Sequence, residues 1–234
     1  MSGAGRTAAI MQPTWLPYLG YFQLIAAADV FVFLDDVQFA RRSWQSRNRI
    51  LDPAGQEVLL SVGLKKQSRD TAILDIEIDD ARPWRADQLA AIRAAYAASP
   101  HFADGFAFLE DQLARPESRL ADLTCGLIEA AARQAGLSTP FVRASTLGCG
   151  GVRSDHLLAV CRAVEATDYL SPTGSADYIA QDAVFADAGF PVAFRTFAER
   201  PYPQSQGEPF IPFMSFVDAL MNVGWRGLRD LVRP

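Results

Sequence analysis

Two groups of polar and aromatic residues near the N-terminus have the types and spacing expected of a ligand-binding site. The first group consists of Gln12, Trp15, Tyr18 and Tyr21, and the second lies in the stretch "DDVQFARRSWQSRNR". Carboxylates, amides and guanidinium groups of this kind accept protons, bind divalent cations or hold anions. We expect small-molecule chemistry in which the two groups of residues take part together.

The acidic pair Asp35 and Asp36 follows the apolar run "DVFVFL", which has the composition of a buried strand. Consecutive side chains of an extended chain point in opposite directions, so one carboxylate is expected to face a cleft while the other caps a turn or forms an ion pair. The carboxylate in the cleft would be the general base for an attacking amine or hydroxyl, or a ligand for a divalent cation. The alternative is that the pair caps the following turn and meets Arg41 or Arg42.

The segment after the acidic pair carries amide, aromatic and guanidinium groups. The guanidinium forks of Arg47 and Arg49 suit phosphates and carboxylates, and Asn48 can bind an amide or a hydroxyl. Together with Gln38 and Trp44 they predict a binding site for a nucleotide-linked sugar or a carrier phosphate. The alternative for either arginine is an ordinary surface ion pair with a nearby aspartate.

The stretch "TLGCGGVRSDHLL" runs from an expected strand through glycines to the start of an expected helix, which Ser154 would cap. Backbone N–H groups at a helix N-terminus bind anions, but a plain tight turn has the same pattern, and the full dinucleotide fingerprint is absent. Cys149 and His156 lie there, and a Cys–His pair is the arrangement used in acyl transfer. A buried, inert cysteine is the alternative.

A proline-rich stretch, "RPYPQSQGEPFIPFM", precedes the last expected helix and carries Tyr202, Gln204 and Gln206. Long loops in compact domains are often functional, so this stretch is expected to close the cleft, with Ser215 among the binding residues. The alternative is a C-terminal wrap whose phenylalanines pack on the core, with Ser215 capping the helix. Both can hold together, because apolar anchors would position the polar side chains.

The apolar runs predict the elements that must position these residues. A strand over "RTAAIM", a helix over "LGYFQLIAAA" and a strand over "DVFVFL" make a βαβ unit of a parallel sheet. Further strands are expected over "EVLLSVGL" and "AILDIEI", and strands over "FVRASTL", "DYLSPTG" and "PVAFRTF" alternate with helices. The predicted fold is α/β, a mostly parallel Rossmann-like sheet in a single domain 1–234, with residues 84–136 as a helical insertion or lid. Ligands of such sheets bind beyond the carboxyl ends of the strands.

Composition narrows the class of protein. The net charge is −5, and the absence of a long basic run excludes a general nucleic-acid-binding surface. The three cysteines lack CxxC spacing, and no apolar segment is long enough for a signal peptide or a membrane span. We expect a reduced, cytoplasmic protein without a structural zinc site or a membrane partner, acting on a small-molecule substrate. The sequence indicates neither a cofactor nor an oligomeric state.

Several motifs, in order along nearly the whole chain, resemble those of the WbqC-like protein family. They are "QPTWLPYLGYF", "DDVQF", "WQSRNRI", "YLSPTGSADYI" and "YPQSQGEPFIPFMSFVDALMNVG". The chain departs from the family pattern with Pro172 in place of a glycine and Trp15 in place of a tyrosine. The resemblance implies a biosynthetic transferase that moves an acyl or aminoacyl group onto an amino sugar or another small amine, in polysaccharide or specialised-metabolite synthesis. It implies a nucleotide-linked sugar or a carrier-bound acyl donor, and assigns no catalytic residue.

Two other functions are alternatives at this stage. One is a non-catalytic, sugar-nucleotide-binding protein of the same pathway. The other is an ATP-dependent adenylyl transferase, because the N-terminal strand, loop and helix also resemble the start of pantothenate synthetase and other nucleotidyltransferases. Those enzymes carry His-x-Gly-His at the junction of loop and helix, whereas "PYLGYF" has no histidine. The difference argues against adenylyl transfer, though not against a shared fold.

Overall fold

Two sheets form the framework of the computed structural model, which describes residues 5–197, 199–205 and 207–233. The strands of the larger, five-stranded sheet are β1 (Thr7–Met11), β2 (Val30–Phe33), β5 (Phe141–Arg143), β6 (Asp168–Pro172) and β7 (Val192–Arg195). The smaller sheet is an antiparallel hairpin of β3 (Arg47–Leu51) and β4 (Glu57–Ser61). The hairpin contains part of the residues expected at the site.

The larger sheet has the strand order β5-β2-β1-β6-β7, and every neighbouring pair is parallel. Counted along the chain within this sheet, the order is 3-2-1-4-5, which is that of a Rossmann-like sheet. The direction of winding therefore reverses between β1 and β6, and the crevice beyond their carboxyl ends is where such sheets bind ligands. The predicted α/β fold with a mostly parallel sheet is confirmed.

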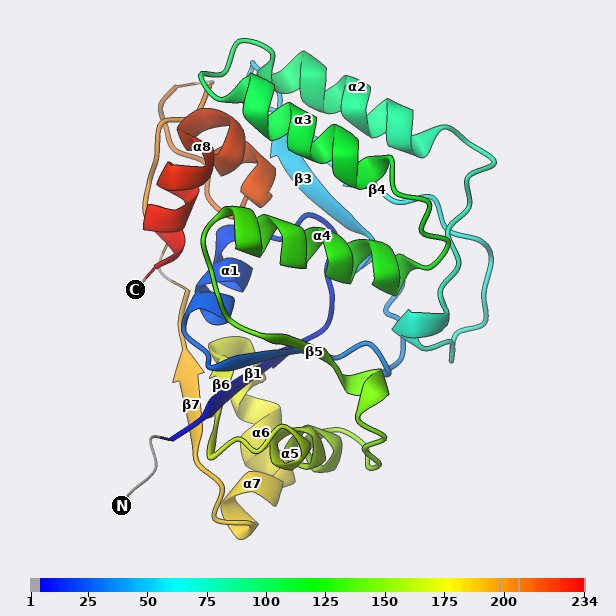
Figure 1. Ribbon diagram of the computed structural model, residues 1–234, viewed down its shortest axis with the longest axis vertical. Coiled ribbons are helices and arrows are strands. Elements are labelled where there is room, and N and C mark those ends of the chain that lie inside the picture. The colour runs from blue at the N-terminus through cyan, green and yellow to red at the C-terminus, as the bar shows by residue number, and fades with distance from the viewer. Residues whose placement is uncertain (1–4, 198, 206, 234) are drawn as a thin grey trace.

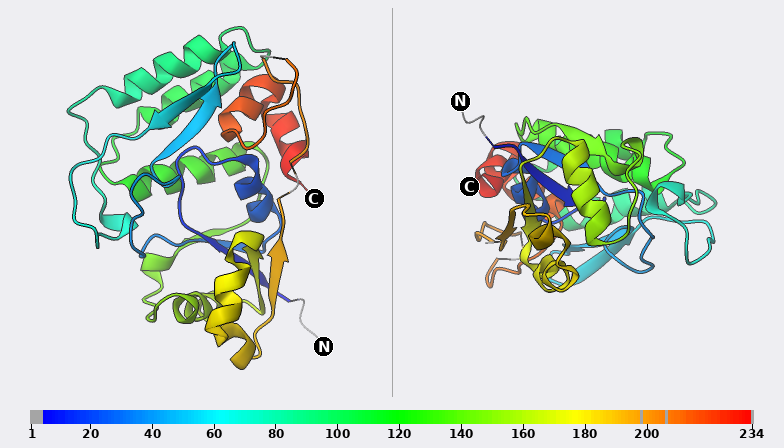
Figure 2. Two further views of the ribbon diagram at one scale, coloured as in Figure 1. Left: turned by 180° about the vertical axis from the view of Figure 1, so that it is seen from behind. Right: turned by 90° about the horizontal axis from the view of Figure 1, so that it is seen from below.

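Helices cover both faces of this sheet (Figures 1 and 2). One face carries α1 (Leu19–Ala26), α4 (Leu120–Gln134) and α8 (Phe216–Val232), with α2 (Trp84–Tyr96), α3 (Phe102–Leu113) and the hairpin beyond them. The other face carries α5 (Ser154–Ala163), α6 (Ala176–Asp182) and α7 (Val184–Asp187). Short 3-10 turns occur at η1 (Ile73–Asp75), η2 (Ala144–Thr146) and η3 (Thr173–Ser175). No helix in the described ranges is both long and apolar enough to cross a bilayer.

The strand side chains divide between two hydrophobic cores. Ala9, Phe31 and Phe33 belong to the larger core, which includes α1, α4, α8 and the helices α2 and α3. Ala8 and Ile10 belong to the smaller core, on the side of α5 and α7. Because both faces of the sheet are covered, its central strands are apolar on both sides, and this is why "DVFVFL" shows no alternation.

Two local expectations are wrong. The stretch "AILDIEI" was expected as a strand, but it forms the turn η1 and an irregular segment, in which Ile73 and Ile76 are both fully buried. The turn brings both side chains into the larger core, which an alternating strand would not do. Ser154 does not cap α5, because the cap position is held by Arg153, and the Ser154 Oγ instead donates to Asp182 Oδ2 at 2.7 Å.

Candidate functional site

A cavity of about 440 Å³ opens beyond the carboxyl end of β1, and we call it the aromatic cavity. It is lined by Met11, Thr14, Pro17, Tyr18, Tyr21, Trp44, Asn48, Arg49 and Phe213. Two smaller hollows, of about 190 and 280 Å³, extend from the same place toward the carboxyl ends of β6 and β7, and Met11 lines all three. The hollows therefore surround the point where the winding of the sheet reverses.

Two polar atoms of residues in the wall of the aromatic cavity are buried and have no hydrogen-bond partner in the described part of the chain. They are the Oγ1 of Thr14 and the Nε of Arg49. The Nη1 of Arg49 does have a partner, the Oε1 of Glu57 at 2.7 Å, and its guanidinium carbon lies 5.8 Å from the centre of the Trp44 ring. Buried polar atoms in native proteins nearly always have partners, so these two atoms are exceptions in the wall of the aromatic cavity.

Tyr18 and a neighbouring carboxyl, Glu199, form a second polar element beside the aromatic cavity. The Tyr18 ring packs at right angles on Phe197, with 5.0 Å between ring centres. Burial and the charge of Glu199 raise the pKa of Tyr18, which keeps the phenol a hydrogen-bond donor. Burial also raises the pKa of Glu199, whose Oε2 accepts from the Phe213 N–H at 2.7 Å while its Oε1 is buried without a partner in the described residues.

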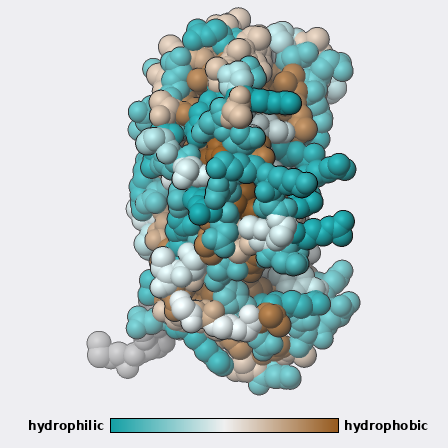
Figure 3. Space-filling model, turned by 90° about the vertical axis from the view of Figure 1, so that its right-hand side faces the viewer, coloured by the Kyte–Doolittle hydropathy of each residue, from teal (hydrophilic) through white to brown (hydrophobic). Residues whose placement is uncertain are grey.

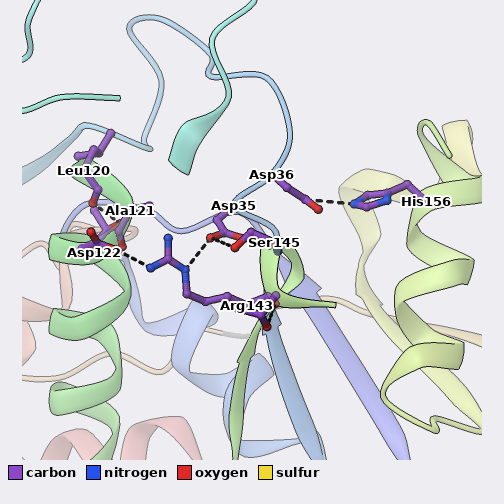
Figure 4. A network of polar contacts seen from close by, with 10 residues as sticks. Asp35, Asp36, Leu120, Ala121, Asp122, Arg143, Ser145 and His156 are labelled. Atoms are coloured by element: carbon purple, nitrogen blue, oxygen red, sulfur yellow. Dashed lines mark hydrogen bonds and ion pairs between the residues drawn. The ribbon is translucent and has the colours of Figure 1, made fainter. Parts of the chain in front are cut away.

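Asp35 is fully buried and lies in an internal ion pair, not in a cavity wall (Figure 4). Its Oδ2 accepts from the Arg143 Nε at 2.6 Å and from the Ser145 Oγ at 2.8 Å, and its Oδ1 accepts from the Ser145 N–H at 3.0 Å. Arg143 also pairs with Asp122 on α4. Arg41 and Arg42, the partners considered for the acidic pair, are not those of Asp35. The bonds of Asp35 join the end of β2 to β5 and, through Arg143, to α4.

Asp36 points away from Asp35, as expected for consecutive residues, and contacts α5 (Figure 4). Its Oδ1 lies 3.1 Å from the Nε2 of His156, whose Nδ1 lies 3.2 Å from the Gly150 carbonyl oxygen. Burial and the charge of Asp36 raise the pKa of Cys149, so the thiol is a poor nucleophile at neutral pH. His156 is thus paired with Asp36, and not with Cys149 as an acyl-transfer pair would require. Among the described residues, no cluster of side chains suited to a metal ion occurs.

Two residues expected to bind a ligand form hydrogen bonds that shape the loop after β1. Trp15 is fully buried, and its Nε1 donates to the Gln88 Oε1 at 3.0 Å. The Nδ2 of Asn48 donates to the carbonyl oxygens of Trp15 and Leu16 at 3.1 and 2.8 Å. Asn48 therefore lines the aromatic cavity with an amide already bonded to the loop, and it joins that loop to β3.

The glutamines expected at the site lie in different places. Gln12 lines the 190 Å³ hollow, its Oε1 accepts from the Gln45 Nε2 at 2.7 Å, and its carbonyl oxygen accepts from the Tyr21 hydroxyl at 3.1 Å. Gln38 lies outside the aromatic cavity, and its Nε2 donates to the Arg69 carbonyl oxygen at 2.7 Å. Arg47, at the start of β3, does not line the aromatic cavity.

The C-terminal polar residues surround a buried carboxylate, that of Asp218 on α8. Its oxygens accept from the hydroxyls of Tyr96 and Tyr202, each at 2.7 Å, and from the Gln204 Nε2 at 2.9 Å. Burial raises the pKa of Asp218. The Ser215 Oγ accepts from the Val217 N–H at 3.2 Å and caps α8. These bonds match the alternative of a C-terminal wrap and a helix cap, while Gln206 lies outside the described residues.

The Tyr202→Phe variant is expected to lose about 1.5–3 kcal/mol of unfolding free energy, because a buried carboxylate loses one of its hydroxyl donors. Urea unfolding followed by circular dichroism would measure the change. Tyr18→Phe is the matched control, since no hydrogen bond of its hydroxyl occurs within the described residues, and it should change stability by no more than about 0.5 kcal/mol. Equal losses in the two variants would contradict the role given to Tyr202.

The structure thus brings together Tyr18, Tyr21, Trp44, Asn48 and Arg49 from the expected set. Sequence reasoning missed Thr14 and Glu199. Thr14 could have been found from the sequence, because its hydroxyl lies in the loop between Pro13 and Pro17 that follows a buried strand. Glu199 had no such signal, because only the fold places it near Tyr18 and Arg49.

The fold and this geometry define a class of protein. It is a Rossmann-like α/β protein with a ligand-sized cavity at the point where the winding of its sheet reverses. The chain belongs to the WbqC-like protein family, whose profile matches residues 12–230. It is 31% identical over 227 residues to the uncharacterized protein Rv1507c of Mycobacterium tuberculosis, and the match covers 92% of this chain and 93% of that protein. No solved structure matches the chain significantly.

Proposed function

We propose that the protein is a biosynthetic transferase that moves an acyl or aminoacyl group onto an amino sugar or another small amine. The observation that carries this proposal is the aromatic cavity, with the unpartnered polar atoms of Thr14 and Arg49. Aromatic and apolar walls with a few fixed polar groups are typical of sites that bind small organic molecules. A guanidinium group adds affinity for a carboxylate or a phosphate on the same molecule. Family membership supports a biosynthetic role.

Acyl transfer to an amine requires a base, and Glu199 is the carboxyl group best suited to that role. The amine nitrogen attacks the acyl carbonyl carbon, the new N–C bond forms, and the nitrogen loses a proton while the leaving group departs with its electron pair. A carboxyl whose pKa is raised by burial is a stronger base than an exposed one. The neutral phenol of Tyr18 beside it would donate a hydrogen bond to the oxyanion that develops on the acyl oxygen.

Incubation with nucleotide-linked amino sugars and acyl-coenzyme A donors, followed by mass spectrometry of the products, tests the activity. An acylated amine formed only in the presence of the protein is the expected result. Binding of an amino sugar without any product over hours would favour the non-catalytic pathway protein instead. Exchange of labelled pyrophosphate into ATP, driven by a carboxylic acid, would favour the adenylyl transferase.

The Arg49→Ala variant is expected to weaken binding of the anionic substrate roughly tenfold, because one charge-assisted hydrogen bond is lost. Isothermal titration calorimetry with the substrate found in the product screen would measure this. Glu57→Gln is the matched control, since it removes the exposed ion pair of Arg49 and leaves the arginine in place. If Arg49→Ala binds the substrate with unchanged affinity, Arg49 does not contact the anionic group of the substrate.

A further inference from the structure

A hollow, apart from the aromatic cavity and its two adjoining hollows, is lined by three arginines, and we call it the basic hollow. It encloses about 600 Å³ and is lined by Gln38, Phe39, Ala40, Arg41, Arg42 and Arg69. None of its three arginines forms an ion pair with a carboxylate among the described residues, whereas the nearby Lys65 is paired with Glu77. In a chain with a net charge of −5, three unpaired guanidinium groups around one hollow are a local excess of positive charge.

The turn that carries two of these arginines is fixed before any ligand arrives. The Ser43 Oγ donates to the Ala40 carbonyl oxygen at 2.6 Å, and the Gln45 Oε1 accepts from the Ala40 N–H at 2.9 Å. Arg42 has a left-handed backbone with φ of 57°, a conformation that is costly for a residue other than glycine. Costly backbone conformations of this kind cluster at functional sites.

The third arginine comes from a different segment, and direct bonds hold the two segments together. The Gln38 Nε2 donates to the Arg69 carbonyl oxygen at 2.7 Å, and Arg41 donates to the Gln67 carbonyl oxygen. A backbone bridge joins Gln38 to Ala72. Figure 3 looks onto the side of the molecule that carries the segment between β4 and α2, and hydrophilic residues cover much of this face. Arg41, Arg42 and Arg69 are exposed and the bonds above join their two segments, so the basic hollow is formed in advance and open to solvent.

The same turn also borders the aromatic cavity. Trp44 lines that cavity, two positions after Arg42 of the basic hollow. The Gln45 Nε2 donates to the Oε1 of Gln12, which lines the adjoining 190 Å³ hollow. One extended molecule with an anionic end and an aromatic or apolar end would contact both places through this turn.

We propose that the basic hollow binds the diphosphate group of the donor substrate, with Arg41, Arg42 and Arg69 as its ligands. Planar guanidinium forks bind phosphate oxygens in pairs, and three of them balance most of the charge of a diphosphate. This inference rests on the proposed function only for the statement that the bound molecule is a substrate. The binding itself is tested without turnover.

Calorimetric titration of inorganic pyrophosphate into the intact protein tests the basic hollow. Arg42→Ala and Arg69→Ala are each expected to weaken pyrophosphate binding roughly tenfold, and binding to the unaltered protein should fall as salt is raised, since salt screens charge pairs. Arg162→Ala is the matched control, because it removes an exposed arginine of α5 that does not line the basic hollow, and it should bind pyrophosphate as the unaltered protein does. Thermal unfolding of each variant would verify that it is folded.

Two further titrations distinguish the sources of a diphosphate group. Tighter binding of uridine diphosphate than of pyrophosphate would support a nucleotide-linked donor, and tighter binding of coenzyme A would support a carrier-bound donor. The proposal is overturned if pyrophosphate does not bind, or if folded Arg42→Ala and Arg69→Ala bind it with full affinity. If Arg49→Ala loses pyrophosphate binding and the two variants of the basic hollow keep it, the anion binds in the aromatic cavity. That result overturns this inference but not the proposed transferase.

Discussion

Replacing Asp35 by alanine is expected to lower the free energy of unfolding by about 3 kcal/mol. The carboxylate is fully buried, and its removal leaves the Ser145 N–H and the Nε of Arg143 without their acceptor. The loss lies at the lower end of the range for broken buried ion pairs, because Arg143 is partly exposed and keeps its second partner, Asp122. For a chain of this length the change corresponds to a fall in Tm of roughly 6–12 °C.

Urea unfolding would measure this loss, and the free energies of unfolding of Asp35→Ala and Asp122→Ala should be compared directly. Both variants remove a carboxylate from the same arginine, but the Asp122 side chain is 46% exposed and that of Asp35 is not exposed at all. Asp122→Ala should therefore cost less than about 1 kcal/mol, as exposed pairs do. Similar losses in the two variants would show that the buried pair does not hold β2 against β5 in the way described.

Replacing Glu199 by glutamine is expected to reduce turnover about 10²- to 10⁴-fold while the protein stays folded. The amide still accepts from the Phe213 N–H, so the loop keeps its shape, but it can no longer take a proton from the attacking amine. The affinity for the amine should change much less than the rate. Single-turnover kinetics with the substrate pair found by mass spectrometry would separate the two effects.

Two variants serve as controls for Glu199→Gln. Asp36→Asn removes the carboxylate that is already engaged by His156, and we expect a smaller loss of turnover than in Glu199→Gln. Cys149→Ser should leave turnover unchanged, because burial and the charge of Asp36 raise the pKa of the thiol and so disfavour the reactive thiolate. A larger loss of turnover in Asp36→Asn than in Glu199→Gln would indicate that the general base is in the acidic pair after β2, and not Glu199.

The part of the candidate site that sequence reasoning located depends on residues close together in the chain. β1 and β2 are joined by one helix and pair in parallel, so the segments that follow them necessarily meet at one edge of the sheet. Tyr18, Tyr21, Trp44 and Arg49 come from those two segments, and all four line the aromatic cavity. Continuous apolar runs were also enough to place β1 and β2 of the larger sheet.

The remainder depended on contacts between distant parts of the chain. The Arg143 partner of Asp35 lies 108 positions away, and nothing near Asp35 distinguishes it from Arg41 or Arg42. Tyr202 and Gln204 have the composition of binding residues, but they satisfy the buried carboxylate of Asp218, which a pattern of residue types does not reveal. Glu199 escaped notice for the same reason, since its neighbours Tyr18, Arg49 and Phe213 come from the loop before α1, from β3 and from the C-terminal stretch.

The hydrogen bond between the side chains of Gln12 and Gln45 has a thermodynamic consequence. It joins the loop after β1 to the turn that carries Arg41 and Arg42, so one hydrogen bond connects the two proposed binding regions. If a ligand in either region shifts this bond, the free energy of the shift enters the binding of the other ligand as well. Linkage then requires that each ligand change the affinity of its counterpart by the same factor, whichever of the two binds first.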